Sequence, residues 1–176
     1  ARDPQMRERR RAIITAPASV RSVGEAVMAA DRLLETAKAQ ADAQVSERNA
    51  REKAELMRQL GMDEGESATK ASRTMIRQLE EDQKRRSKRA LTDAIDRALI
   101  DLLAIYRDVL MVQVGGDGEL INTDLSDLVH QIAQDSTPRQ TLARVDHIET
   151  ARKRLVSNGN PLLVLEDMAI SLRPQA

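Results

Sequence analysis

Residues 90–112 read ALTDAIDRALIDLLAIYRDVLMV, and this stretch determines the fold class. Apolar residues recur in it at alternating steps of four and three, which is the spacing of one face of an α-helix. A second apolar row lies beside the first. The first row contains Leu91, Ile95, Ala98, Leu102, Ile105, Val109 and Val112, and the second contains Leu99, Leu103, Tyr106 and Leu110. A helix with so broad an apolar surface needs neighbours on both sides, so we predict the central helix of an all-α bundle.

The composition of the 176-residue chain supports this class. Tyr106 is the only aromatic residue, so Leu, Ala, Val, Ile and Met must form the core, which suits helices better than sheets. The 28 Lys and Arg balance the 28 Asp and Glu, so no overall field attracts nucleic acid or an anionic membrane. The absence of cysteine excludes disulfides and thiolate chemistry. No apolar run approaches the ~18 residues of a membrane span, and we expect a cytoplasmic protein with no membrane contact.

The N-terminal segment is predicted to be a short charged helix. Pro4 suits a first helical turn, and Pro17 stops the helix after Thr15. Because this helix begins abruptly and no Met precedes Ala1, we expect a fragment of a longer protein, with residues 1–17 left over from a preceding domain. The arginines of residues 7–11 are interpreted as a solvated helix face, because no aromatic residue is interleaved with them.

Two long helices are predicted to pair as an antiparallel hairpin. Ser22 and Glu25 have the spacing of a capping box, and the helix that they start runs to Gly61. A second long helix follows the polar turn 61–67 and continues into the central stretch. Folding the chain about residue 64 places segment 42–53 opposite segment 80–89. Within 18–113 we therefore predict a base (18–37 and 90–113) packed in the bundle and a projecting charged stalk (38–89).

The charged run EEDQKRRSKR, residues 80–89, has two interpretations. Its clustered cations could form a nucleic-acid patch. However, Glu80 and Lys84, Glu81 and Arg85, and Asp82 and Arg86 all stand four residues apart in the order that favours ion pairs within a helix. We therefore favour a self-neutralised, solvated helix and expect no direct DNA binding.

The remaining segment, 114–176, is predicted to add three helices to the bundle. The glycine-rich stretch 114–122 is a connector, because it lacks the residues of a phosphate-binding or calcium-binding loop. Thr123 or Asp124 is expected to cap a helix ending at Gln134. The next two helices each begin with a cap followed by proline, at Thr137-Pro138 and at Asn160-Pro161. Apolar residues nearly encircle the last helix, which indicates deep burial or contact with another subunit.

No catalytic, cofactor-binding or metal site is predicted in this chain. His130 and His147 lie on different predicted helices among polar neighbours, so we interpret both as surface histidines. Carboxylates occur as helix caps and ion-pair partners, and no nucleophile elbow is present. We therefore expect no enzyme activity, no cofactor and no small-molecule ligand for this chain.

The C-terminal stretch 143–172, ARVDHIETARKRLVSNGNPLLVLEDMAISL, resembles the last two helices of bacterial DNA polymerase III clamp-loader subunits. Residues 20–34, VRSVGEAVMAADRLL, are similar to the actinobacterial delta-prime type in particular. The resemblance implies a clamp-loader collar domain, with residues 1–17 a remnant of the AAA+ lid. It also implies assembly with the gamma/tau and delta subunits into a heteropentamer that loads the sliding clamp on primed DNA. The long charged hairpin departs from the compact collar of the family.

A collar needs lateral apolar surfaces, and the sequence suggests candidates for the interface between subunits on the last helix and the central helix. These candidates are Leu162, Leu165, Met168, Leu172, Leu99, Leu103 and Tyr106. Three alternatives stay open: a stand-alone coiled-coil adaptor, a helical nucleic-acid binder, and the collar of the gamma/tau subunit.

Overall fold

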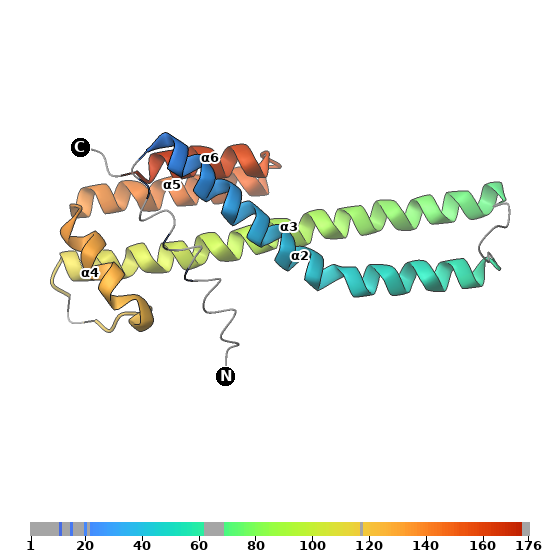
Figure 1. The fold of residues 1–176 in the computed structure, drawn as a ribbon, viewed down its shortest axis with the longest axis horizontal. Helices are drawn as coiled ribbons and strands as arrows, with labels where there is room; N and C mark the ends of the chain where they lie inside the picture. The colour runs from blue at the N-terminus through green and yellow to red at the C-terminus, as the bar shows by residue number, and fades with distance from the viewer. Residues whose placement is uncertain are drawn as a thin grey trace. The chain divides into compact units, whose positions relative to one another are not determined.

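The computed structural model describes residues 11, 15, 20, 22–61, 69–116 and 118–173 (Figure 1). The elements in these ranges are α2 (Val23–Gln59), α3 (Lys70–Gln113), the short 3-10 helix η1 (Thr123–Leu125), α4 (Ser126–Gln134), α5 (Pro138–Val156) and α6 (Pro161–Ser171). The described residues include no strand, and the prediction of an all-α fold is confirmed. Most of the predicted N-terminal helix and of the turn 61–67 lies outside the described residues.

The ends of α2 follow the predicted signals. The backbone N–H of Glu25 donates to Ser22 Oγ at 3.1 Å, and the N–H of Ser22 donates to Glu25 Oε2 at 3.3 Å, so the predicted capping box forms. At the other end Gly61 has a φ of 62°, the left-handed conformation that lets a glycine end a helix. Residues close in sequence therefore provide hydrogen-bond acceptors for two N–H groups at the start of α2, and a glycine provides the turn at its end.

The chain divides into two compact units. Unit 1 contains residues 1–37 and 95–176, and unit 2 contains residues 38–94. Both long helices contribute to both units, since α2 and α3 each cross a boundary. The predicted domain boundaries and the projecting stalk stay predictions.

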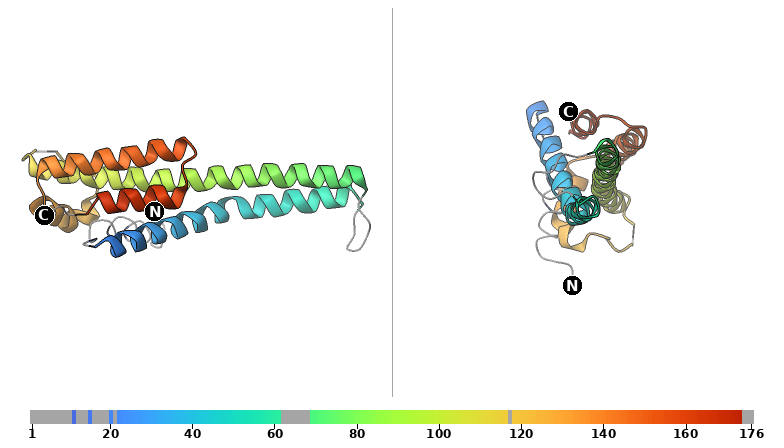
Figure 2. Two further views of the ribbon diagram at one scale, coloured as in Figure 1. Left: turned by 90° about the horizontal axis from the view of Figure 1, so that it is seen from above. Right: turned by 90° about the vertical axis from the view of Figure 1, so that its right-hand side faces the viewer.

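Unit 1 has an extensive apolar core. The central stretch of α3 supplies much of it, as predicted from its two apolar rows. The largest side chains with less than 2% exposure in this unit are Tyr106, Ile95, Leu99, Ile105, Val109, Val129, Ile148, Leu165 and Leu172. They come from α3, α4 and α5, and from α6 and the residue that follows it. Figure 2 shows α5 lying alongside the part of α3 that belongs to this unit.

The helix pair α5 and α6 closes unit 1 through the two cap-proline signals predicted from sequence. Thr137 forms a full capping box with Gln140, and the Asn160 side chain accepts from the N–H groups of Leu162 and Leu163. Between the helices the N–H of Gly159 donates to the carbonyl of Arg154 at 2.8 Å. A Cβ at Gly159 would stand 2.8 Å from that same oxygen, so the turn requires glycine.

The start of α4 differs from the prediction. Neither Thr123 nor Asp124 caps it; both belong to η1, and the residue at the N-cap is Leu125, with no side-chain hydrogen bond to the helix. Leu125 is buried, so its apolar contact fixes the chain where a polar cap was expected. The predicted end at Gln134 is confirmed.

Candidate functional site: apolar and charged surfaces

The seven predicted interface residues all belong to unit 1, and most of them are interior. Leu99, Tyr106, Leu165, Met168 and Leu172 are between 0 and 2% exposed, while Leu103 and Leu162 are half-buried. The nearly all-round apolar surface of α6 is thus largely covered within the chain itself. These buried residues set the shape of the bundle, and a role for the set in contacts between subunits stays a prediction.

Other large apolar side chains of unit 1 do reach the surface. Leu163 of α6 is 62% exposed and Ile100 of α3 is 46% exposed, and both lie next to predicted candidates in sequence or along a helix face. Leu142 and Val156 of α5 are also exposed. Sequence periodicity could not separate Leu163 from Leu162 or Leu165, because apolar residues nearly encircle this helix. The exposed set offers apolar area that another protein of an assembly could cover.

A buried carboxylate, Asp108, organises the connector after α3. Its side chain is fully buried and accepts from the backbone N–H of Ile121 at 3.1 Å and of Asn122 at 2.8 Å. The Asn122 side-chain amide donates to Oδ2 at 2.9 Å, and Arg107 donates to Oδ1 at 2.9 Å. Asp108 therefore fixes the end of the connector against α3, a role that no local motif signals.

The electrostatics of Asp108 follow from these partners. Burial acts to raise the pKa of the carboxyl, but the hydrogen bonds from Asn122, Ile121 and Arg107 outweigh it and lower the pKa below the usual value. The carboxylate is therefore stabilised in its charged form. Elsewhere in unit 1, burial raises the pKa of Tyr106 to about 12, partly offset by Arg144, whose guanidinium lies 5.9 Å from the ring centre. The phenol is therefore protonated at neutral pH, as a structural residue requires.

Polar contacts join α3 to α5 and α5 to α6. Arg152 of α5 makes a two-pronged contact with Asp96 of α3, with Nε 2.7 Å from Oδ1. Arg154 of α5 pairs with Asp167 of α6. The first pair is about one third exposed and the second is largely exposed, so both add little to an association that the apolar residues drive.

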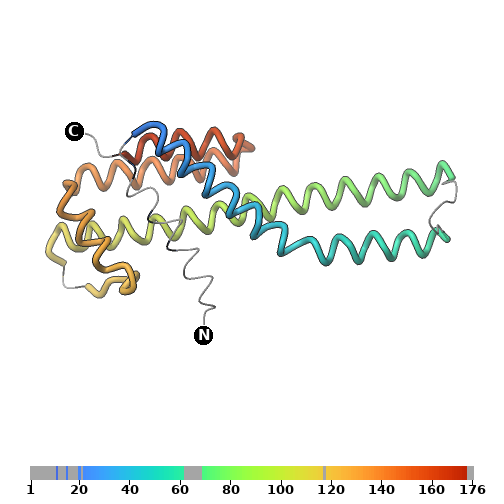
Figure 3. Tube along the Cα trace, viewed as in Figure 1, coloured from blue at the N-terminus to red at the C-terminus, as the bar shows by residue number. Residues whose placement is uncertain are grey.

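Unit 2 is an antiparallel pair of helical segments from α2 and α3, which Figure 3 traces along the backbone. Its small apolar cluster contains Ala41, Val45 and Ala90, with Leu91 packed against it. Polar contacts then bridge the two segments, because few apolar residues remain. The bridges are Lys53 to Glu80 at 3.1 Å, Arg86 to both Asn49 and Glu52 at 2.8 Å, and Gln83 to the Asn49 carbonyl at 2.9 Å.

The three ion pairs predicted within the charged run do not form. Glu80 contacts Lys53, and Arg86 contacts Glu52, across the helix pair. Glu81 contacts Arg77 and Asp82 contacts Arg85 instead of their predicted partners. Partners on α2 therefore replace the predicted ones for Glu80 and Arg86, whereas Glu81 and Asp82 have other partners within α3. The contact of Arg86 with Glu52 is partly buried, so water screens it less. The hydrogen bonds from Arg86 and Arg48 hold the pKa of Glu52 at about 2.

The described part of the chain contains no group of three or more His, Cys, Asp and Glu side chains that could hold a metal ion. Both histidines are exposed, and His130 Nδ1 lies 2.8 Å from the Ser126 carbonyl. Across the described helices, none combines the length and the apolar character that crossing a membrane requires.

Comparison with known proteins assigns the family. The family model for the C-terminal part of the DNA polymerase III delta subunit matches residues 67–173. The chain is 38% identical over 72 residues to DNA polymerase III subunit delta' of Bacillus subtilis (strain 168), a match that covers 41% of this chain and about a fifth (22%) of that protein. No solved structure matches. The family match spans α3 to α6 and so includes the stretch 143–172 that carries the resemblance, but not residues 20–34. The chain belongs to the family of C-terminal domains of the DNA polymerase III delta subunit.

Proposed function

We propose that this chain is the C-terminal collar domain of a clamp-loader delta-prime subunit and that unit 1 supplies its contacts with other subunits. The family match across residues 67–173 carries the proposal. Its role is assembly, without chemistry of its own, in the cytoplasmic machine that loads the sliding clamp on primed DNA. The proposed partners are the gamma/tau and delta subunits, in a heteropentamer.

The surface of unit 1 supports an assembly role. Leu163 and Ile100 lie outside its core, whereas five of the seven predicted interface residues are buried within it. Exposed apolar side chains of this size are stabilised when a partner covers them, at about 25 cal/mol per Å² of buried apolar surface. We propose that Leu163 and Ile100, flanked by the half-buried Leu162 and Leu103, form the contact surface. The buried candidates act by shaping it.

The choice of delta-prime rests on the curated relative, whose name is subunit delta', whereas the family description names the delta subunit. Copy number distinguishes the candidates. We expect a delta-prime collar to enter the complex as one copy. If the chain were a stand-alone coiled-coil adaptor, it would bind neither the gamma/tau nor the delta subunit.

Native mass spectrometry of the chain mixed with the gamma/tau and delta subunits of the same organism tests the proposal. We expect one copy of the chain in a pentamer, and competition with full-length delta-prime. Several copies would contradict the assignment to delta-prime, and failure of the folded chain to associate would contradict the proposal.

An interface variant sharpens this test. Leu163→Glu places a charge at an exposed site and should abolish incorporation while circular dichroism shows unchanged helix content. Met75→Glu is the matched control, because Met75 is equally apolar and 49% exposed but belongs to unit 2. Substitutions at Met168 or Leu172 are unsuitable, since both are core residues and a charge there would unfold the bundle.

A further inference from the structure

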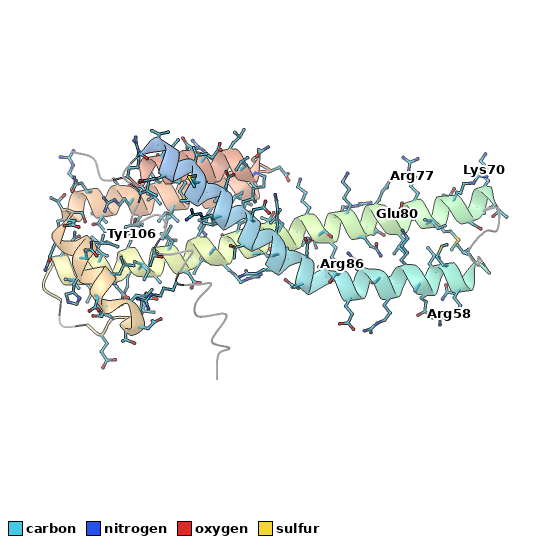
Figure 4. All side chains as sticks on the ribbon, viewed as in Figure 1. Arg58, Lys70, Arg77, Glu80, Arg86 and Tyr106 are labelled. Carbon is cyan, nitrogen blue, oxygen red and sulfur yellow. The ribbon has the colours of Figure 1, made fainter. Side chains whose placement is uncertain are left out.

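One face of α3 in unit 2 carries a row of exposed cations. The row, named here the outer stripe, consists of Lys70, Arg73, Arg77, Lys84 and Lys88. At 3.6 residues per turn these positions fall within an arc of roughly 60° on the helix. The opposite face contains Ser72, Gln83 and Ala90, which are buried or half-buried. Figure 4 shows Lys70 and Arg77 on the side of α3 that faces away from α2.

Cations outnumber acids along this part of α3. Residues 70–94 contain eight Lys and Arg against four Asp and Glu, although the whole chain is balanced. Glu80 is directed to Lys53 of α2, and Asp82 contacts Arg85, which lies outside the stripe. The predicted ion pair between Glu80 and Lys84 therefore does not form. Glu80 thus pairs with α2, while the stripe cations lie on an exposed face of α3 on which Glu81, the partner of Arg77, also stands.

A shallow hollow marks one end of the stripe. It is lined by Lys70, Arg73, Thr74 and Arg77, so every lining residue is a cation or a hydrogen-bonding side chain. Within it, Arg77 contacts Glu81 at 3.2 Å, but its side chain is 83% exposed. Exposed ion pairs contribute less than about 1 kcal/mol, so Arg77 can exchange this carboxylate for another anion at little cost.

We propose that the outer stripe binds the phosphate backbone of duplex DNA without reading its sequence. Lys88 stands eighteen positions after Lys70, a span of roughly 27 Å along the helix. This length matches the rise of about eight successive phosphates along one strand of duplex DNA. Lysine and arginine on a straight helix bind phosphates through charge and N–H donors, and they need no preformed pocket.

Duplex DNA fits this surface better than single strands or lipid. Binding of single strands relies on aromatic side chains that stack on bases, and the one aromatic residue, Tyr106, is 1% exposed in unit 1. Membrane binding requires an amphipathic helix with an apolar face at the lipid. Here the residues between the stripe cations include Thr74 and Glu81, both exposed and polar.

This inference goes beyond assembly and revises the expectation of no direct DNA binding. That expectation depended on three ion pairs within the charged run, and none of the three forms. Glu80 pairs with Lys53 of α2, while Glu81 and Asp82 pair with Arg77 and Arg85 of α3. The test uses the 176-residue chain alone, so its outcome is independent of whether the chain joins a pentamer.

The experiment measures the dissociation constant of the chain for a fluorescein-labelled duplex of about 30 base pairs by anisotropy, between roughly 50 and 200 mM NaCl. The stripe variant is Lys70→Gln, Arg73→Gln, Lys84→Gln. The matched control, Arg48→Gln, Arg51→Gln, Arg58→Gln, removes the same charge from exposed positions of α2. Glutamine keeps helix propensity, and circular dichroism verifies that both variants are folded.

We expect the stripe variant to bind at least tenfold more weakly at ~100 mM NaCl, with a salt slope shallower by about 2 to 3. The control should stay within about threefold of the parent chain. Absence of binding by the parent chain, or equal loss in both variants, would overturn the proposal. Tighter binding to a single strand of the same length, or binding to phosphatidylserine vesicles but not to the duplex, would overturn the assignment of duplex DNA.

Discussion

Unit 1 and unit 2 both contain segments of the two long helices α2 and α3, yet different forces hold each unit together. In unit 1 the segment of α3 after Ile95 is surrounded by apolar side chains, and Leu99 and Val109 have no exposure. In unit 2 the segment before Ala94 has a small cluster around Val45 and Ala90, and charged or amide side chains make the remaining bridges.

This difference means that the two units differ in how far their stability limits the residues at their surfaces. Buried apolar area provides most of the folding free energy, so the core positions of unit 1 tolerate few substitutions. A helix pair held by ion pairs tolerates change at exposed positions, because each such contact contributes little. Unit 2 can therefore present a charged surface, whereas unit 1 presents exposed apolar residues around a packed core. Variants in both units test this contrast, from the largest expected effect to the smallest.

The largest loss is expected in the core of unit 1. Leu165→Ala should lower the free energy of unfolding by about 2–5 kcal/mol, because it removes buried contacts and leaves a cavity. Urea unfolding followed by circular dichroism measures it. The control is Leu163→Ala on the same helix, where an exposed side chain should change stability by less than about 0.5 kcal/mol. Equal effects would mean that the core is assigned wrongly.

The next effect concerns Asp108. Asp108→Asn should cost about 2–3 kcal/mol, because the N–H groups of Ile121 and Asn122 lose a charged acceptor in a buried site. Asp124→Asn, at an exposed position of η1, is the control and should be nearly neutral. Hydrogen exchange of the amides of residues 121 and 122 would locate the effect; unchanged protection would contradict the proposed role.

The contribution of Asp108 should also depend on pH. Its pKa is lowered in the folded chain from the usual value of 3.8, so the unfolded chain takes up the proton first as the solution is acidified. The stability difference between the parent chain and Asp108→Asn should be complete at about pH 6 and should shrink as the pH falls below about 4. Urea unfolding at several pH values across this window measures it. If the stability difference grew as the pH fell, the pKa of Asp108 would be raised in the folded chain, contrary to this account.

The smallest effect is expected in unit 2. Arg86→Met removes the contacts with Asn49 and Glu52 and should cost about 1 kcal/mol, seen as faster hydrogen exchange of unit 2 amides. The pKa of Glu52 should rise from about 2 toward 4.5, although Arg48 still lowers it; carbon-detected NMR titration reports this value. The control is Arg77→Met, which removes only an exposed intrahelical pair. It should leave the hydrogen exchange of unit 2 amides and the pKa of Glu52 unchanged. If Arg86→Met lowered the free energy of unfolding by more than Leu165→Ala does, the proposed difference between the two units would be contradicted.

Local signals in the sequence predicted much of this fold. The boxes at Ser22 and Thr137 and the glycine at 61 mark helix ends through contacts between near neighbours, so a short stretch is sufficient to recognise them. The two apolar rows of the central stretch predicted burial from periodicity alone. Family resemblance, carried by residues 143–172, supplied the functional class, which no motif of catalysis or binding could have provided.

Contacts between distant residues could not be predicted in this way. Asp108 and Asn122 are joined only after the connector folds back, and Lys53 finds Glu80 only once the helices pair. The predicted pairs of Glu80 and of Arg86 failed for the same reason, since Lys53 and Glu52 of α2 compete for them. Glu81 instead pairs with Arg77 of the same helix, a choice between two spacings that the sequence leaves open. The interface candidates shared this limit: periodicity marks Leu165 and Leu163 alike as apolar, and packing alone buries one and exposes the other.

The claim that unit 1 assembles while unit 2 displays charge is tested most directly by native mass spectrometry of the chain mixed with gamma/tau and delta. Three forms are compared: the parent chain, Leu163→Glu with Ile100→Glu in unit 1, and the glutamine variant of the outer stripe in unit 2. The account predicts that the stripe variant enters the pentamer as the parent chain does, whereas the unit 1 variant stays free. Incorporation of the unit 1 variant, or exclusion of the stripe variant, would contradict it.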